Sequence, residues 1–189
     1  MLDIWTRLGV LGPVQHPTRA RAAVLVPLYR DSSSVVRVIL TKRLDHMRTH
    51  PGDIVFPGGR IEPGEAPEET ALREACEEVG LPEDAVDIVG GLTPVTTRDP
   101  GNLIIPVVAK VDRPEELTPD KDEVELIIEP SVRELLDDSK WRSENWFGSK
   151  MWFYEFQDGL LWGATAFMMR EFLAHVRGDA DDRWQDDGG

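Results

Sequence analysis

The stretch that decides the fold of this chain runs from Gly58 to Leu81 and reads GGRIEPGEAPEETALREACEEVGL. Its two glycines predict a tight turn, and after a short loop the remainder predicts one helix over Pro67–Val79. Pro67 suits the first turn of a helix, where its missing N–H would have no partner. Gly80 is placed to end the helix in a left-handed cap. A turn, a loop and a helix are therefore expected in direct succession.

Three glutamates, Glu74, Glu77 and Glu78, lie at positions i, i+3 and i+4 of this helix, so their carboxylates project from one face. Like charges at this spacing destabilise an isolated helix by a few tenths of a kcal/mol. A solvated acidic face is one explanation of the pattern. The other is a bound cation, because hard divalent ions such as Mg²⁺ take carboxylate oxygens and are commonly shared with substrate phosphates.

The surrounding residues extend the pattern to G-x5-E-x7-R-E-x-x-E-E-x-G-L, which is filled by Gly59, Glu65, Arg73, Glu74, Glu77, Glu78, Gly80 and Leu81. This resembles the Nudix box. The resemblance implies an enzyme that hydrolyses a nucleoside diphosphate linked to another moiety. It also implies Mg²⁺ or Mn²⁺ held by Glu74, Glu77 and Glu78, with Arg73 orienting one of these carboxylates and Glu65 supporting the join between loop and helix.

Residues upstream of the box narrow the resemblance. Ile39-Leu-Thr-Lys-Arg43, Arg48, Gly52 and Phe56-Pro-Gly-Gly59 match a pattern of the coenzyme A diphosphatase branch of this superfamily, and Trp162-Gly-Ala-Thr-Ala166 resembles its C-terminal segment. This branch implies coenzyme A or a derivative as substrate, cleaved to 4′-phosphopantetheine and adenosine 3′,5′-bisphosphate. Leu44 stands where the pattern has serine, so the nucleotide preference stays open.

Three basic residues, Lys42, Arg43 and Arg48, form a cluster in an otherwise acidic chain. Arginine suits bidentate contact with phosphate oxygens, which makes these residues candidates for substrate binding. The alternative is pairing with acidic neighbours on the surface. Gly58 and Gly59 would let the backbone approach the ligand closely.

The general base is the least determined residue of the predicted site. The candidates are Glu77 of the box and Glu123 from a later charged loop, with Glu125 as a third choice. Glu123 precedes an expected strand, and its alternative role is that of an exposed loop acid.

Two other functional readings remain open. One is a Nudix hydrolase of another nucleoside diphosphate derivative, such as ADP-ribose, a dinucleoside polyphosphate or a damaged nucleotide. The other is a catalytically silent domain that senses a nucleotide. Such silent domains usually lose box glutamates, whereas this chain retains all of them.

Composition sets outer bounds. The 189 residues carry a net charge of −14, which argues against a protein that grips nucleic acid through its phosphates. The single cysteine, Cys76, suits a reducing compartment, and the N-terminus shows no signal peptide. The longest apolar runs are too short to span a bilayer. These features predict a cytoplasmic protein without a membrane partner, and they leave the oligomeric state open, a homodimer included.

The order of elements predicts one α/β domain over residues 1–189, with a core from about 20 to 177 and a disordered tail from 178 to 189. Strands are expected at 22–28, 35–41, 53–56, 86–96, 103–111, 124–129, 150–156 and 160–162. Helices are expected at 2–8, 67–79, 131–137 and from 165 or 166 to 177. The sheet should be mixed, and the resemblance implies an α/β/α sandwich.

Overall fold

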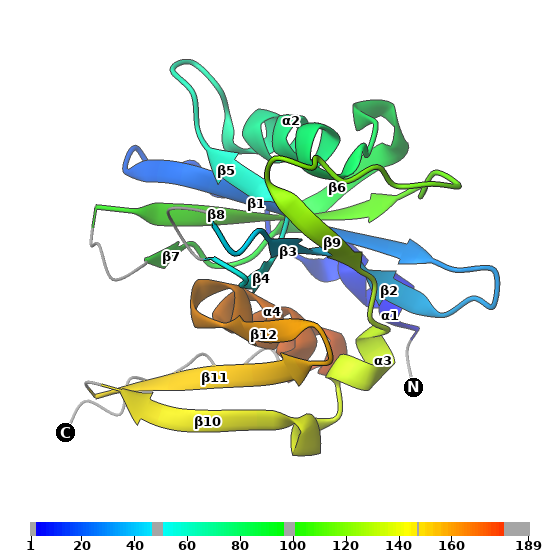
Figure 1. Ribbon diagram of the computed structural model, residues 1–189, viewed down its shortest axis with the longest axis vertical. Helices are drawn as coiled ribbons and strands as arrows, with labels where there is room; N and C mark the ends of the chain where they lie inside the picture. The colour runs from blue at the N-terminus through cyan, green and yellow to red at the C-terminus, as the bar shows by residue number, and fades with distance from the viewer. Residues whose placement is uncertain (1–2, 47–50, 97–100, 147, 180–189) are drawn as a thin grey trace.

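The computed structural model describes residues 3–46, 51–96, 101–146 and 148–179. Its main sheet has six strands (Figure 1). Four run in the order β2 (Val36–Val38), β1 (Ala20–Arg30), β8 (Leu103–Val111) and β6 (Val86–Gly91), while β5 (Gly58–Arg60) pairs with β1 and β7 (Val95–Thr96) pairs with β8. Strands β1 and β8 are parallel and the other pairs are antiparallel, so the sheet is mixed as expected.

Two smaller antiparallel sheets complete the strands. One joins β4 (Ile54–Val55), β3 (Leu40–Arg43) and β9 (Val124–Ile128), and the other joins β10 (Trp141–Trp146), β11 (Ser149–Phe156) and β12 (Gly159–Trp162). Short helical turns connect these parts: α1 (Ile4–Arg7), η1 (Leu8–Val10), η2 (Glu83–Ala85), α3 (Val132–Leu135) and η3 (Asp138–Lys140). Ser131 caps α3 by accepting the Glu134 N–H, which confirms that helix start.

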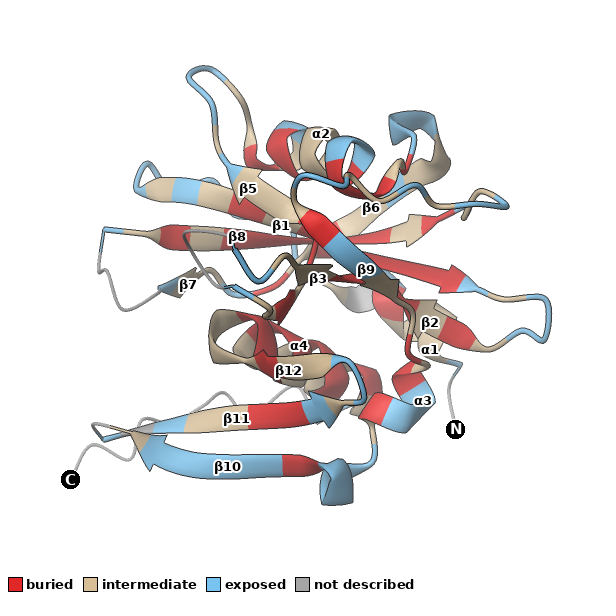
Figure 2. Cartoon of the chain, viewed as in Figure 1, coloured by how far each residue is buried: buried red, intermediate tan, exposed pale blue. Residues whose placement is uncertain are grey.

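The two long helices, α2 (Pro67–Val79) and α4 (Gly163–Arg177), lie on opposite faces of the main sheet (Figure 1). Side chains alternate between these faces along β1. Leu25 packs in the cluster that contains Ala75 of α2, whereas Val26 packs in the cluster that contains Phe172 of α4. Buried residues fill both interfaces (Figure 2). The expected α/β/α arrangement is therefore confirmed.

Helix α2 has the boundaries that the sequence predicts. The Glu69 carboxylate accepts the Ala66 N–H at 2.8 Å, which satisfies a backbone donor just before the helix. At the other end, Gly80 adopts φ 68°, and its N–H donates to the Cys76 carbonyl at 3.0 Å. These caps fix the three box glutamates on the last two turns of the helix.

Several strands differ from the sequence predictions. Gly58 and Gly59 do not form a tight turn, because they belong to β5 and pair with Val24 and Ala23 of β1. The strand expected over 35–41 is divided into β2 and β3, which join different sheets, and the strand expected over 86–96 is divided into β6 and β7. Strand β10 was not predicted. Strands β5 and β3 pair with partners distant in sequence, β1 and β9, whereas β10 forms a hairpin with the adjacent β11.

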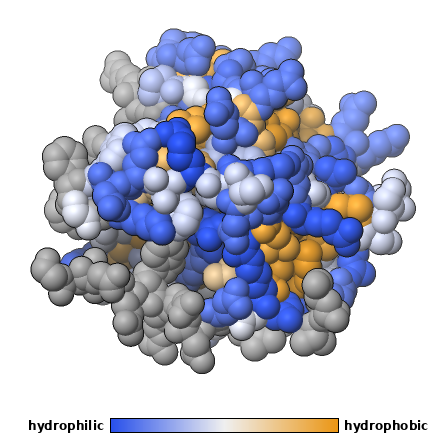
Figure 3. Space-filling model, turned by 90° about the horizontal axis from the view of Figure 1, so that it is seen from below, coloured by the Kyte–Doolittle hydropathy of each residue, from blue (hydrophilic) through white to orange (hydrophobic). Residues whose placement is uncertain are grey.

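The surface of the described residues is largely polar. Figure 3 shows mainly hydrophilic residues on the face seen from below, with a smaller hydrophobic area among them. Among the described residues, no helix has both the length and the apolar character that a membrane crossing requires. The tail residues 180–189 and the predicted phosphate ligand Arg48 lie outside the described residues.

Candidate active site

A buried carboxylate marks the candidate site. Glu78, on the last turn of α2, is only 4% exposed although it is an acidic residue. The Gly58 N–H of β5 donates to its Oε2 at 3.1 Å, and Nη1 of Arg43, at the end of β3, lies 3.9 Å from its Oε1. Helix α2 and two strands from different sheets therefore converge on one carboxylate.

The electrostatics around Glu78 are unfavourable for a negative charge. Burial, together with the neighbouring carboxylates Glu74 and Glu123, raises the pKa of Glu78 to about 8, while the Gly58 N–H and Arg43 oppose the shift. Burial likewise raises the pKa of Glu74, against the opposing effect of Arg73. The site thus gathers more acidic groups than its own cations balance.

The backbone of β5 leaves room for these carboxylates. A Cβ atom on Gly59 would lie 2.3 Å from Oε1 of Glu74, much closer than a real carbon atom can approach. A Cβ atom on Gly58 would lie 2.4 Å from the Ala23 carbonyl oxygen of β1. Gly59 therefore makes space for an acidic side chain, while Gly58 makes space for the neighbouring strand.

Arg73 connects the loop before α2 with the acidic face of the helix. Its Nε donates to Glu65 at 2.8 Å, its Nη1 donates to Glu74 at 2.9 Å and to Glu77 at 3.1 Å, and its Nη2 reaches the Arg60 carbonyl at 3.2 Å. Hydrogen bonds from Arg73 and Thr70 lower the pKa of Glu65 to about 2. One guanidinium therefore joins the loop acid Glu65 to the helix acids Glu74 and Glu77.

The candidate general bases occupy different surroundings. The Glu77 side chain is 59% exposed and is paired with Arg73. Glu123 is partly buried, and its charge acts on both Glu74 and Glu78, so the structure brings it to the box. Glu125 is paired instead with Lys42 at 2.9 Å. Of the two later acids, Glu123 is thus the one whose charge acts on Glu74 and on the buried Glu78.

The basic residues also divide. Arg43 lies at the site, beside Glu78. The Lys42 ammonium is bonded to Glu125, which is the surface pairing that the sequence left open as an alternative to phosphate contact. Of the three basic residues predicted to bind phosphate, Arg43 is therefore the one that the described structure places beside Glu78.

The donor chemistry of this site fits a hard divalent cation. The charges of Glu74 and Glu123 both act on Glu78, and carboxylate oxygens are the ligands that Mg²⁺ and Mn²⁺ prefer. Within the described residues, no three His, Cys, Asp or Glu side chains are already arranged as a set of metal ligands. Arg73 occupies Glu74 and Glu77, so binding would require these side chains to turn.

Two contacts at the site were not anticipated from the sequence. One is the Gly58 N–H donated to Glu78, a backbone contact that carries no residue-type signal. The other is Asp53, whose carbonyl accepts the Arg43 N–H at 3.0 Å and whose Oδ1 accepts Nε1–H of Trp162 at 2.9 Å. The position of Asp53 directly after Gly52 offered a turn signal, but its partner lies 109 residues away.

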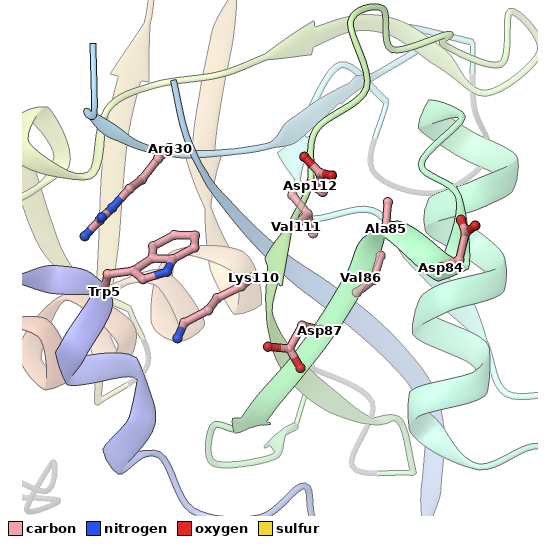
Figure 4. A pocket seen from close by; sticks show the side chains of 9 residues that line it. All are labelled: Trp5, Arg30, Asp84, Ala85, Val86, Asp87, Lys110, Val111 and Asp112. Carbon is pink, nitrogen blue, oxygen red and sulfur yellow. The ribbon is translucent and has the colours of Figure 1, made fainter. Parts of the chain in front are cut away.

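An open pocket of about 480 Å³ lies away from these residues (Figure 4). It lies at the C-terminal ends of β1 and β8, where Arg30 and Lys110 both approach the Trp5 ring, at 5.2 and 5.3 Å from its centroid. Three exposed aspartates, Asp84, Asp87 and Asp112, also line it. It contains no glutamate of the box, so we place the candidate site at Glu78 on chemical grounds.

The family model described as the NUDIX domain matches residues 18–147. A protein of Enterobacter sp. (strain 638), named uncharacterized Nudix hydrolase NudL, is 34% identical over 182 residues, which cover 92% of this chain and 93% of that protein. Nudix hydrolase 3 of Caenorhabditis elegans is 40% identical over 121 residues, which cover 60% of this chain and 48% of that protein. A crystal structure of a MutT protein from Methanosarcina mazei Go1 superposes with a TM-score of 0.55 at 17% identity, covering 90% of this chain and 97% of that one.

Proposed function

This chain belongs to the NUDIX domain family and is a Nudix hydrolase, and we propose that it hydrolyses the diphosphate bond of coenzyme A or one of its derivatives. The products would be 4′-phosphopantetheine and adenosine 3′,5′-bisphosphate. Water adds across the P–O–P bridge, so that one phosphorus gains the new oxygen and the other leaves with the bridging oxygen. We propose Mg²⁺ or Mn²⁺ as the metal.

The observation that carries the proposal is the buried Glu78 carboxylate, which lies among Glu74 and Glu123 with Arg43 beside it. Glu74 and Glu78 would hold the metal, with Glu77 available after Arg73 releases it. When bound, the metal supplies a lower pKa for water and neutralises charge that develops on the diphosphate. Arg43, whose planar guanidinium suits phosphate oxygens, would bind the diphosphate next to these carboxylates.

We propose Glu123 as the general base. It is partly buried at the edge of the acidic cluster, whereas Glu77 is paired with Arg73. Glu123 also lies in a fixed backbone, because its N–H donates to the Asp120 carbonyl at 3.2 Å and its carbonyl accepts the Leu44 N–H at 3.2 Å. A base held in this way can take a proton from water without rearrangement of the main chain.

Support for coenzyme A comes from the residues around Arg43. The segment from Ile39 to Gly59 carries the resemblance to the coenzyme A diphosphatase branch, and it supplies both Arg43 and the Gly58 N–H to the site. The C-terminal segment that begins at Trp162 carries the second part of this resemblance and is bonded to Asp53 of the same loop region.

The test is a substrate panel with Mg²⁺, analysed by mass spectrometry of the products. Coenzyme A, an acyl derivative, ADP-ribose and a dinucleoside polyphosphate are compared at equal concentration. We expect the highest kcat/KM for coenzyme A or its acyl derivative, and reaction in ¹⁸O-water would identify the phosphorus that is attacked. Preferential cleavage of ADP-ribose or the dinucleoside polyphosphate would overturn the substrate assignment, and absence of cleavage for every compound would overturn the reaction.

A further inference from the structure

The hydrogen bond between Trp162 and Asp53 joins the last strand of the chain to the strand pair that carries Arg43. The indole Nε1–H donates to Asp53 Oδ1 at 2.9 Å, in a partly buried position. Neither residue is one of the glutamates Glu74, Glu78 and Glu123 of the site. We infer that Trp162 is a positioning residue, which holds Asp53 and through it the backbone of Arg43 at the substrate site; this inference rests on the proposed function of that site.

The first step of the argument is the link from Asp53 to Arg43. The Asp53 carbonyl accepts the Arg43 N–H at 3.0 Å, directly beyond the two-residue ladder of β3 and β4. Strand β4 is only two residues long, so its own ladder, Thr41 with Val55 and Lys42 with Ile54, gives limited support to this end. The hydrogen bond from Trp162 to the Asp53 side chain therefore helps to fix the backbone of Arg43, whose side chain extends toward Glu78.

The second step is that Trp162 itself is held firmly. Its ring lies nearly parallel to that of Phe153, with an interplanar angle of 7° and centroids 6.4 Å apart, and Trp146 lies on the same aromatic cluster at 6.1 Å. Phe153 is only 5% exposed. Trp162 also immediately precedes α4, whose Phe172 and Leu173 are fully buried in the core. The indole N–H is thus presented from a rigid part of the molecule.

The third step is the close packing of β12 on β4. A Cβ atom on Gly159 would lie 3.3 Å from both the Gly52 carbonyl oxygen and Cδ1 of Ile54. The start of β12 therefore already lies against the strand that follows Asp53. The hydrogen bond from Trp162, at the other end of β12, adds the directional contact that packing alone does not provide.

Trp162→Phe tests the inference, because it removes the indole N–H and keeps an aromatic ring, with a loss of ring area that the control variant shares. The matched control is Trp146→Phe in the same cluster, whose indole N–H donates instead to the exposed Glu144 at 2.9 Å. With whichever diphosphate the wild type cleaves, we expect Trp162→Phe to raise KM about tenfold, on the order of one lost hydrogen bond, and to leave kcat within about twofold. Trp146→Phe should leave KM at the wild-type value.

Amide hydrogen exchange gives a readout that does not depend on activity. In Trp162→Phe, the Arg43 amide, bonded to Asp53, should exchange about tenfold faster, whereas the Ile39 amide, bonded to the Pro27 carbonyl at 3.0 Å, should keep its rate. Unchanged exchange at Arg43, or equal effects in Trp162→Phe and Trp146→Phe, would overturn the inference.

A second pair of variants removes the acceptor rather than the donor. Asp53→Ala should reproduce the rise in KM. Asp53→Asn keeps an oxygen acceptor, so its KM should stay close to the wild-type value. Combining Asp53→Ala with Trp162→Phe should add little to either change alone, and full additivity would contradict the coupling. These comparisons can use any substrate that the wild type cleaves. If coenzyme A is not the substrate, the role of Trp162 can therefore still be tested.

Discussion

The backbone N–H of Gly58 donates to Oε2 of Glu78 at 3.1 Å, across 20 residues of chain. This bond orients a carboxylate that is almost fully buried, and it connects the last turn of α2 to the first residue of β5. The bond favours the ionised form of Glu78, although burial and neighbouring acids favour the neutral form. A positive ion would resolve this conflict in favour of the ionised form.

Glu78→Gln should separate charge from shape at this position. The glutamine oxygen can still accept the Gly58 N–H, so we expect the melting temperature to be unchanged or raised, because a buried acid is removed. Turnover should fall by about 10²-fold or more, as is typical when a key electrostatic group is lost. Glu69→Gln, on the same helix but at its N-terminal cap, is the control and should keep wild-type turnover. Near wild-type turnover of Glu78→Gln at saturating Mg²⁺ would contradict the metal assignment.

Gly59→Ala should disturb Glu74 without changing any polar group. The new methyl carbon would meet Oε1 of Glu74 at 2.3 Å, and the paired backbone of β5 resists movement, so the carboxylate must turn away. We expect kcat/KM to fall about tenfold or more, since small displacements of positioned groups are costly. Gly12→Ala is the control, because a Cβ atom there has no neighbour within 4 Å. Steady-state kinetics over a Mg²⁺ titration make the comparison, and equal activity of the two variants would refute the role of Gly59.

Arg73→Ala should lower the stability of the fold. The guanidinium pairs with Glu65, Glu74 and Glu77 and also donates to the Arg60 carbonyl, so its removal takes the cation away from the partly buried Glu74 and leaves Glu65 with its bonds from Thr70 and the Glu62 N–H. We expect a loss of about 1 to 3 kcal/mol in the free energy of unfolding, typical of charged hydrogen bonds, measured by urea denaturation. Arg60→Ala removes an exposed side chain but keeps that carbonyl, and it should be nearly neutral. A stability for Arg73→Ala equal to that of Arg60→Ala would contradict the prediction.

Tyr29 predicts a loss of stability at alkaline pH. Burial, together with the hydrogen bond and negative charge of Glu129, raises the pKa of Tyr29 from 10.0 to about 12. Between these values the unfolded chain loses the tyrosine proton while the folded chain keeps it, so stability falls as the pH rises. The decrease from this group is at most about 1.4 kcal/mol per pH unit.

The measurement compares urea unfolding of the wild type and Tyr29→Phe from pH 9 to pH 11. The difference in their free energies of unfolding should shift steadily in favour of Tyr29→Phe above pH 10. A constant difference across this range would show that Tyr29 does not titrate as described.

Local chemistry explains what could be predicted from the sequence. Pro67, the acidic first turn and Gly80 determine both ends of α2, and the apolar run Leu103–Val111 reads directly as strand β8. These signals act over a few residues. The same spacing rules place Glu74, Glu77 and Glu78 on one face, so the acidic part of the site was visible without a structure.

Long-range pairing explains what could not be predicted. Gly58 and Gly59 have the composition of a turn, yet antiparallel pairing with Val24 and Ala23 makes them a strand. Lys42 is of a residue type that often binds phosphate, yet it is paired with Glu125, which lies 83 residues away in the sequence. Such partners are set by sheet register, which residue composition does not reveal.

The contacts of Arg73 also have a consequence for folding in the absence of metal. Because the Arg73 guanidinium already neutralises part of the acidic helix, the chain carries its own counter-charge and can fold before a metal ion binds. Treatment with a chelator should then abolish activity while leaving the protein folded, and adding the divalent metal salt back should restore activity. Cellular supply of the ion would control the working fraction of the enzyme and leave its abundance unchanged.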